Sequence, residues 1–176
     1  MGTSTRICPP IIGVIGWKNS GKTTLVVRLV EEFVGRGLSV STVKHAHVRF
    51  DVDHPGRDSH RHREAGAQEV AIASPVRWAL MHELRGAPEP TLDEMVDRLS
   101  PCDLIVVEGY KTGRHLKIEI RRQGARQHDP IAPRDPGVIG IASDTPESAD
   151  TDLPVFHIDD TIAIADLVSA RLQLGA

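Results

Sequence analysis

The sequence predicts an α/β fold, in which a mainly parallel β-sheet is flanked by helices and interrupted by a hairpin insertion. Two observations carry this prediction. Apolar runs of strand length alternate with segments of helical periodicity through most of the 176 residues, an order typical of parallel sheets with helical connections. In addition, Leu104-Ile105-Val106-Val107 is continuously apolar, as is usual for a central strand covered on both faces.

The first predicted elements are a strand, a helix and a second strand. The first strand covers residues 11–15, and apolar residues at helical spacing from Leu25 to Phe33 indicate the helix. Residues 38–44 alternate as a strand does. The polar segment 45–64 follows, and we expect a long loop there with a short helix near its end. Long loops in compact domains are usually functional or disordered.

A hairpin and a short helix are predicted next. Residues 70–73 and 76–81 have strand character and flank the turn sequence Ser74-Pro75. Thr91 and Glu94 form a capping box, in which each side chain can satisfy an unpaired amide at a helix start. The apolar stripe behind it predicts a helix that extends to Leu99.

The second half of the chain continues the alternation. Strands are predicted at 104–107, 116–120, 138–142 and 155–158, and a closing helix at 164–172. In the strand 116–120 apolar residues alternate with polar ones, so we expect it to be half exposed.

Composition limits the function. The formal net charge is −3, so the chain lacks the basic excess that steers proteins onto nucleic acid. No apolar run approaches the roughly 18 residues that a membrane helix needs, and we expect a cytoplasmic protein without a membrane partner. Two cysteines, Cys8 and Cys102, form no disulfide framework and are expected to be reduced thiols.

The stretch GWKNSGKTT lies between the first predicted strand and helix. It fits the pattern G-x-x-x-x-G-K-[ST], in which backbone amides and the helix N-terminus hold phosphate, the lysine reaches the β/γ-phosphates and the hydroxyl ligates Mg²⁺. The sequence therefore predicts that residues 1–176 form a single P-loop NTPase-like, nucleotide-binding domain, with a flexible start at 1–9. The expected phosphate-binding residues are Gly16, Lys18, Asn19, Ser20, Gly21, Lys22, Thr23 and Thr24.

Lys18 has two interpretations. A deviant form of the motif places a second lysine directly after the first glycine, where this chain has Trp17, so Lys18 is one position late. It either contacts phosphate or is a solvated charge.

A carboxylate is expected beside the Thr23 hydroxyl to complete the Mg²⁺ site. Glu108 ends the strand 104–107, and Asp103 begins it. Because ligands of open α/β sheets bind at the carboxyl ends of strands, we expect Glu108 rather than Asp103 on the metal side.

Several motifs together resemble one family. They are GxxxSGKTT, KHxHxxxDVDxPGRDSxxxxxAGA at 44–67, RWAL at 77–80, LIVVEGYK at 104–111 and IASD at 141–144. They are similar to MobB, the family of molybdopterin-guanine dinucleotide biosynthesis adaptor proteins. The resemblance implies a homodimeric GTP-binding protein of the deviant P-loop class with weak GTPase activity. It also implies a partner nucleotidyltransferase, MobA, which joins GMP to molybdopterin, with molybdopterin a further candidate ligand.

Asp51 and Asp53 lie in the loop after the second strand. Related NTPases keep a carboxylate there that orients the attacking water or contacts Mg²⁺, so both are candidate catalytic residues beside Lys22; the alternative is a solvated acidic turn. Arg57, Arg61 and Arg63 are candidates for a pterin phosphate, or form a solvated helix face.

Guanine can be selected by one carboxylate that accepts hydrogen bonds from both N1–H and N2–H. Asp144 follows the strand 138–142 and is the candidate for this role, or else a turn residue before Pro146. The N-K-x-D motif of Ras-like proteins does not occur in the sequence, so the preference for guanine depends mainly on the resemblance.

Two other functions fit parts of the sequence. Nickel-insertion GTPases carry His-rich segments, and the segment 45–62 holds five histidines; however, both cysteines are distant from it in the sequence. A small-molecule P-loop kinase would need an arginine-rich lid. The candidate nickel ligands are His45, His47, His54, His60 and His62, and the candidate lid arginines are Arg114, Arg121, Arg122 and Arg126.

Overall fold

The structure, a computed structural model, describes residues 8–46, 50–125, 129–148 and 151–175. Residues 1–7 of the expected flexible start, and the candidates His47 and Arg126, lie outside these ranges. The chain forms two compact units, one of Met1–His45 with Leu92–Ala176 and one of Ala46–Thr91.

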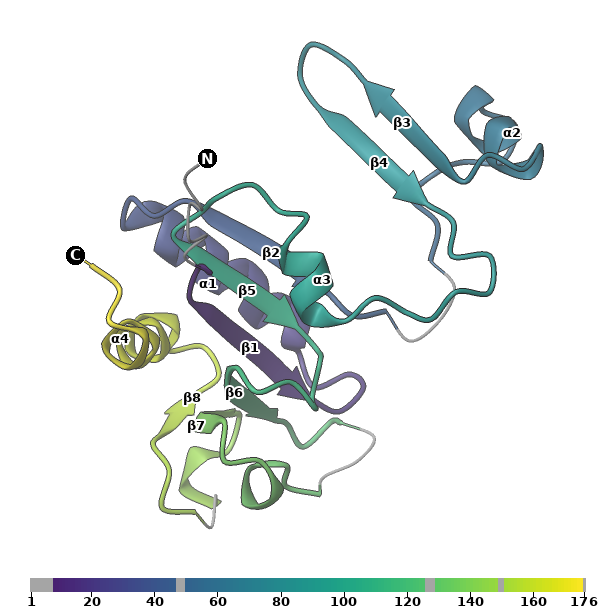
Figure 1. Cartoon of the computed structure of the whole chain (residues 1–176). Coiled ribbons are helices and arrows are strands. Elements are labelled where there is room, and N and C mark those ends of the chain that lie inside the picture. Colours follow the sequence, from purple (N-terminus) through teal and green to yellow (C-terminus); the bar gives the residue numbers. More distant parts are fainter. Residues whose placement is uncertain (1–7, 47–49, 126–128, 149–150, 176) are drawn as a thin grey trace. The chain divides into compact units, whose positions relative to one another are not determined.

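The first unit is built on a six-stranded sheet in the order β2-β5-β1-β6-β7-β8 (Figure 1). Every strand pairs with its neighbours in parallel, so all six carboxyl ends meet at one edge. This confirms the predicted α/β class and parallel sheet. The strands are β1 (Ile11–Gly16), β2 (Val40–Lys44), β5 (Leu104–Glu108), β6 (Leu116–Arg121), β7 (Val138–Ser143) and β8 (Val155–His157).

Helices cover both faces of this sheet. On one face, α1 (Lys22–Gly35) and α4 (Thr161–Leu172) pack over alternate residues of β1, β5 and β6, and Leu29 and Phe33 are fully buried there. On the other face, α3 (Leu92–Val96) packs on the intervening residues of β2 and β5. The double cover explains the continuous apolar run of β5, because each of its residues faces one of two cores.

The expectation of a half-exposed β6 was wrong. Lys117 and Glu119 are 0% and 1% exposed. The Lys117 ammonium contacts the Asp135 carboxylate at 3.0 Å and donates to main-chain carbonyls. The segment that follows β6 covers this face of the strand, so its charged residues are buried with partners.

The second unit consists of α2 (Asp58–Glu64), β3 (Glu69–Ala73) and β4 (Trp78–His82). The two strands form the predicted antiparallel hairpin. The turn is closed by Ser74, whose amide and hydroxyl both donate to the carbonyl of Arg77 at 2.9 and 3.0 Å. The turn therefore includes Val76, which was expected in the strand. The short helix near the end of the polar segment is confirmed as α2.

Other boundaries differ modestly from the prediction. Helix α3 ends at Val96, and Leu99 instead packs from a following turn against the core of that face. Two 3₁₀ helices, η1 (Ala132–Arg134) and η2 (Pro146–Ser148), were not predicted. Among the described residues, no helix has both the length and the apolar character needed to cross a membrane.

Candidate functional site

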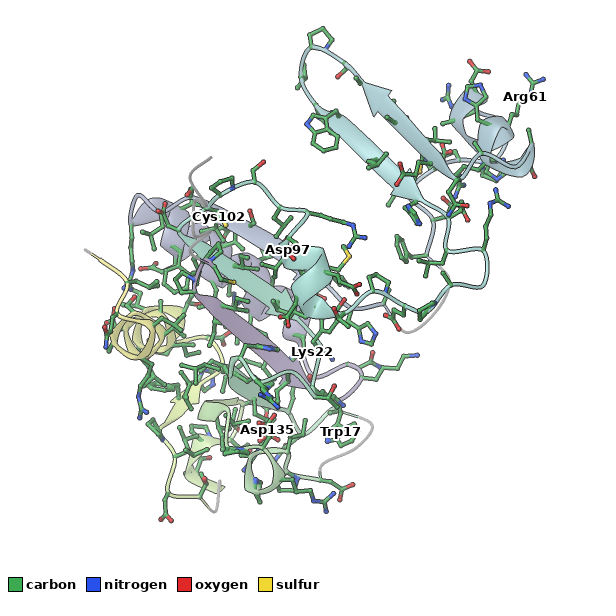
Figure 2. All side chains as sticks on the ribbon, in the orientation of Figure 1. Trp17, Lys22, Arg61, Asp97, Cys102 and Asp135 are labelled. Atoms are coloured by element: carbon green, nitrogen blue, oxygen red, sulfur yellow. The ribbon has the colours of Figure 1, made fainter. Side chains whose placement is uncertain are left out.

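The loop between β1 and α1 lies at the carboxyl edge of the sheet. Figure 2 shows Trp17 and Lys22 at this end and Cys102 at the opposite end. Gly16 is required by close approach, since a Cβ there would lie 2.7 Å from Ser20 Oγ and 2.8 Å from the carbonyl of Ile120. Gly21, directly before the helix, has φ 95°, a conformation that side chains disfavour. Backbone geometry therefore explains why glycine occupies both of these motif positions.

The loop has the form of an anion cradle. The Ser20 amide donates to the Trp17 carbonyl at 3.2 Å, which curls the backbone. The Ser20 hydroxyl is buried and has no hydrogen-bond partner among the described residues. Lys18 and Asn19 are exposed on the loop, and Thr24 is exposed on the first turn of α1. The helix N-terminus adds a partial positive charge at the same place.

Lys22 spans the loop from the helix side. Its ammonium donates to the Trp17 carbonyl at 2.8 Å. Burial lowers the pKa of Lys22, the Glu108 carboxylate opposes that shift, and the positive charges of Lys111 and Lys44 add to it. Three lysines thus lie around one loop in a chain of net charge −3, and their mutual repulsion would be relieved by a polyanion.

The side chains of Thr23 and Glu108, the two residues expected to hold Mg²⁺, contact each other beside the loop. The Thr23 hydroxyl donates to Glu108 Oε1 at 2.8 Å, and the Glu108 side chain is only 11% exposed. Lys44 Nζ lies 3.2 Å from the same carboxylate oxygen. An ammonium therefore already occupies a cation position between these oxygens, and the hydroxyl and carboxylate fit the donor set that Mg²⁺ uses.

Asp103 is separate from this group. Its carboxylate accepts hydrogen bonds from the Ser39 amide and hydroxyl, and these bonds lower its pKa. It joins two chain segments at the amino end of β5, away from the phosphate loop, and the metal role of Glu108 stays a prediction.

Asp51 and Asp53 belong to the second unit, where one arginine holds them. Arg63 Nη2 donates to both oxygens of Asp51, at 3.0 and 2.8 Å, and this pairing lowers the Asp51 pKa. Arg63 also binds Glu83 at 3.0 Å, and Asp53 accepts from the Ser59 hydroxyl at 2.9 Å. The catalytic roles expected for the two aspartates stay predictions.

Asp144, the candidate for guanine recognition, directly follows β7. Its carboxylate accepts the Gln123 amide at 3.2 and 3.3 Å and lies 3.7 Å from Arg122 Nε. Arg122 also lies beside the phosphate loop, because its Nη1 would be 3.7 Å from a Cβ on Gly21. Arg121, by contrast, binds Glu119 at 3.0 Å.

Two contacts at the loop were not predicted. Lys111 Nζ lies 3.6 Å from the centre of the Trp17 ring, a cation–π geometry. The Trp17 indole N–H donates to the Asp129 carbonyl at 2.8 Å. Lys111 belongs to the LIVVEGYK motif and Lys44 to KHxH, so both lysines lie in motifs identified from the sequence. The spacing of these motifs along the chain did not indicate what either lysine contacts.

The histidine segment gives no support to a nickel site. Among the described residues, no group of three or more His, Cys, Asp or Glu side chains is placed to bind one metal ion. The His45 amide donates to the Glu108 carbonyl at 2.9 Å, and its ring lies 4.8 Å from that of Tyr110. His45 thus extends the pairing at the end of β2.

Comparisons with known proteins agree on one family. The model of the family described as Molybdopterin guanine dinucleotide synthesis protein B matches residues 11–144. The molybdopterin-guanine dinucleotide biosynthesis adapter protein of Escherichia coli (strain K12) is 37% identical over 93% of this chain and 94% of its own length. That of Haemophilus influenzae is 36% identical over 93% and 90%. The crystal structure of Bacillus subtilis MobB has a TM-score of 0.70 at 26% identity, over 93% of this chain and 98% of its own.

Proposed function

The chain belongs to the molybdopterin guanine dinucleotide synthesis protein B (MobB) family, and from that membership we propose that it is a GTP-binding adapter in the biosynthesis of the guanine dinucleotide form of the molybdenum cofactor. Its partner in this proposal is the nucleotidyltransferase MobA, acting in the cytoplasm, and molybdopterin is a candidate ligand. The observation that carries the nucleotide-binding part is the group of Lys22, Thr23 and Glu108 around the loop between β1 and α1.

Each residue has a proposed role. The loop amides and Lys22 hold the β- and γ-phosphates, and Thr23 and Glu108 hold Mg²⁺, which would neutralise phosphate charge when bound. Asp144 reads guanine through its carboxylate. Asp51 or Asp53 orients water for a weak GTPase activity. Support comes from the buried Ser20 hydroxyl, which has no hydrogen-bond partner within the described part of the chain, and from the surplus of positive charge at the loop.

A homodimer is also proposed, on the basis of the hairpin in the second unit. Its exposed side chains are mostly apolar; Trp78 is 71% exposed and Leu80 51%. Patches of this kind on soluble proteins mark interaction sites, and a second copy of the chain is the proposed partner.

Calorimetry tests the nucleotide site. We expect GTP to bind the wild-type protein with Mg²⁺ present, and more tightly than ATP. Lys22→Ala should weaken GTP binding at least about tenfold, roughly 1.4 kcal/mol, since it removes a charged contact to phosphate. The variant should also support less guanine dinucleotide formation by the partner transferase. If neither triphosphate binds at millimolar concentration, the proposal is wrong; if Lys22→Ala assists the transferase fully, the adapter works without nucleotide.

A further inference from the structure

Lys44, the last residue of β2, lies in the cation position of the proposed nucleotide site. It is the register partner of Glu108 on the neighbouring strand. Its ammonium lies 3.2 Å from Glu108 Oε1 and 3.5 Å from Thr23 Oγ1, and those two oxygens are 2.8 Å apart. The three groups form one closed cluster in which a single carboxylate oxygen accepts both the hydroxyl and the ammonium.

We infer that Lys44 is a positioning residue that competes with the divalent cation for the Thr23 hydroxyl and the Glu108 carboxylate. This inference rests on the proposed nucleotide-binding function. An ion at ordinary Mg²⁺ distances from these oxygens, about 2.0–2.1 Å, would lie within a few ångströms of the ammonium, and the two positive charges would repel strongly in a partly buried site. Cation binding therefore requires the ammonium to leave.

Only the side chain can move easily. The backbone after Lys44 is held by the His45 amide, which donates to the Glu108 carbonyl at 2.9 Å. A Cβ on Gly109 would lie 3.0 Å from the His45 Cβ, so the two segments are in close contact. The Lys44 side chain is 59% exposed and has a flexible stem, so it can swing away from the carboxylate without disturbing the strand.

The competition links the cation to the nucleotide. Without a triphosphate, a displaced ammonium loses its carboxylate and gains only water. With a triphosphate in the loop, the same ammonium gains phosphate oxygens as new partners. The divalent ion should therefore bind weakly to the protein alone and much more tightly in the presence of the nucleotide, and Lys44 adds to the difference that the phosphate ligands themselves produce.

Manganese binding tests this inference without any measurement of hydrolysis. Mn²⁺ is titrated into nucleotide-free protein and the free ion is followed by electron paramagnetic resonance. Lys44→Met should bind Mn²⁺ at least about tenfold more tightly than wild type, because the competing charge is gone. The gain should disappear when Glu108→Gln is added. Arg171→Met, at an exposed arginine in the last turn of α4, removes the same charge elsewhere and should retain the wild-type affinity.

Equal Mn²⁺ affinities for Lys44→Met and wild type, or an equal gain in Arg171→Met, would overturn the inference. Circular dichroism and thermal melting check the fold, and Lys44→Gln provides a second neutral variant if Lys44→Met unfolds. GTP binding by the wild-type protein, measured separately, tests the proposed function. Failure of GTP binding leaves the manganese result on nucleotide-free protein to decide the role of Lys44 independently.

Discussion

At the scale of single residues, His115 is held in an unusual setting beside β6. Cβ atoms built on Gly13 and Gly113 would each lie 2.5 Å from one of its ring nitrogens. Neither nitrogen has a hydrogen-bond partner among the described residues. Burial, with the Lys117 charge as the second cause, lowers the pKa of His115 from 6.5 to about 4. The ring is therefore neutral at pH 7 and packs against the sheet as an apolar group would.

The lowered pKa predicts acid sensitivity. A histidine with a lower pKa in the folded state than in the unfolded state binds fewer protons when folded, so its contribution to stability is present above about pH 6.5 and is lost as the pH falls toward 4. By pH 5 we expect a loss of about 1 kcal/mol, allowing for screening at a partly exposed site. Urea unfolding at pH 7.5 and pH 5.0 measures this loss, and His115→Gln should show a smaller pH dependence. An equal pH dependence in wild type and variant would contradict the assignment.

The residues of the site differ in how far the sequence alone predicts their positions. Gly16, Lys22 and Thr23 occur in one contiguous motif, whose geometry follows from local backbone requirements. Glu108 could be placed because carboxyl ends of parallel strands share an edge. The position of Lys44 depends on β2 pairing in register with β5, two segments about sixty residues apart, and no local pattern encodes that register.

At the scale of elements, the segment between β6 and β7 is anchored by one carboxylate. Glu119 accepts the amides of Ile131 and Ala132 at 2.8 and 2.9 Å, just where η1 begins. The same segment carries Asp129, whose carbonyl accepts the Trp17 indole N–H. A buried side chain of the sheet thus holds a segment that in turn contacts the phosphate loop.

Glu119→Gln should loosen this segment. The glutamine amide nitrogen cannot accept a hydrogen bond, so one of the two main-chain amides loses its acceptor and the other keeps only a neutral one. The free energy of unfolding should therefore fall by about 1–3 kcal/mol. The chain has two tryptophans, so Trp78→Phe leaves Trp17 as the reporter. We expect its emission to shift to longer wavelength in Glu119→Gln. Glu31→Gln, at an exposed position of α1, is the matched control; similar stability and emission for both variants would refute the anchor.

The same element shows why the sequence misled on β6. Alternation of apolar and charged residues normally marks a strand with one face in water. Here Lys117 and Glu119 face a covering segment that supplies Asp135 and main-chain amides as partners. Periodicity reports which side chains are polar, but it does not report whether a later segment brings partners for them. The strand β5 was predicted correctly because a continuously apolar run of this length is typical of a strand covered on both faces.

At the scale of the whole molecule, the second unit has very little apolar burial of its own. In the hairpin only Val70 is buried, while Ile72, Trp78 and Leu80 are between 44% and 71% exposed. Cross-strand pairing places Trp78 beside Ala73 and Leu80 beside Ala71, so one face of the ribbon is apolar along most of its length. A two-stranded ribbon is marginally stable by itself, and a partner that covers this face would stabilise it.

Trp78→Asp should therefore disrupt the proposed homodimer. Large aromatic residues at the centre of an interface typically contribute at least 2 kcal/mol, and a buried carboxylate adds a desolvation cost, so the dimer dissociation constant should rise at least about thirtyfold. Sedimentation velocity over a concentration series measures it. The matched control is Ile162→Asp, since Ile162 is 62% exposed on α4, and it should dissociate as the wild type does. A wild-type protein that stays monomeric at high concentration, or a Trp78→Asp dimer of unchanged affinity, would contradict a homodimer formed through the apolar face of the hairpin.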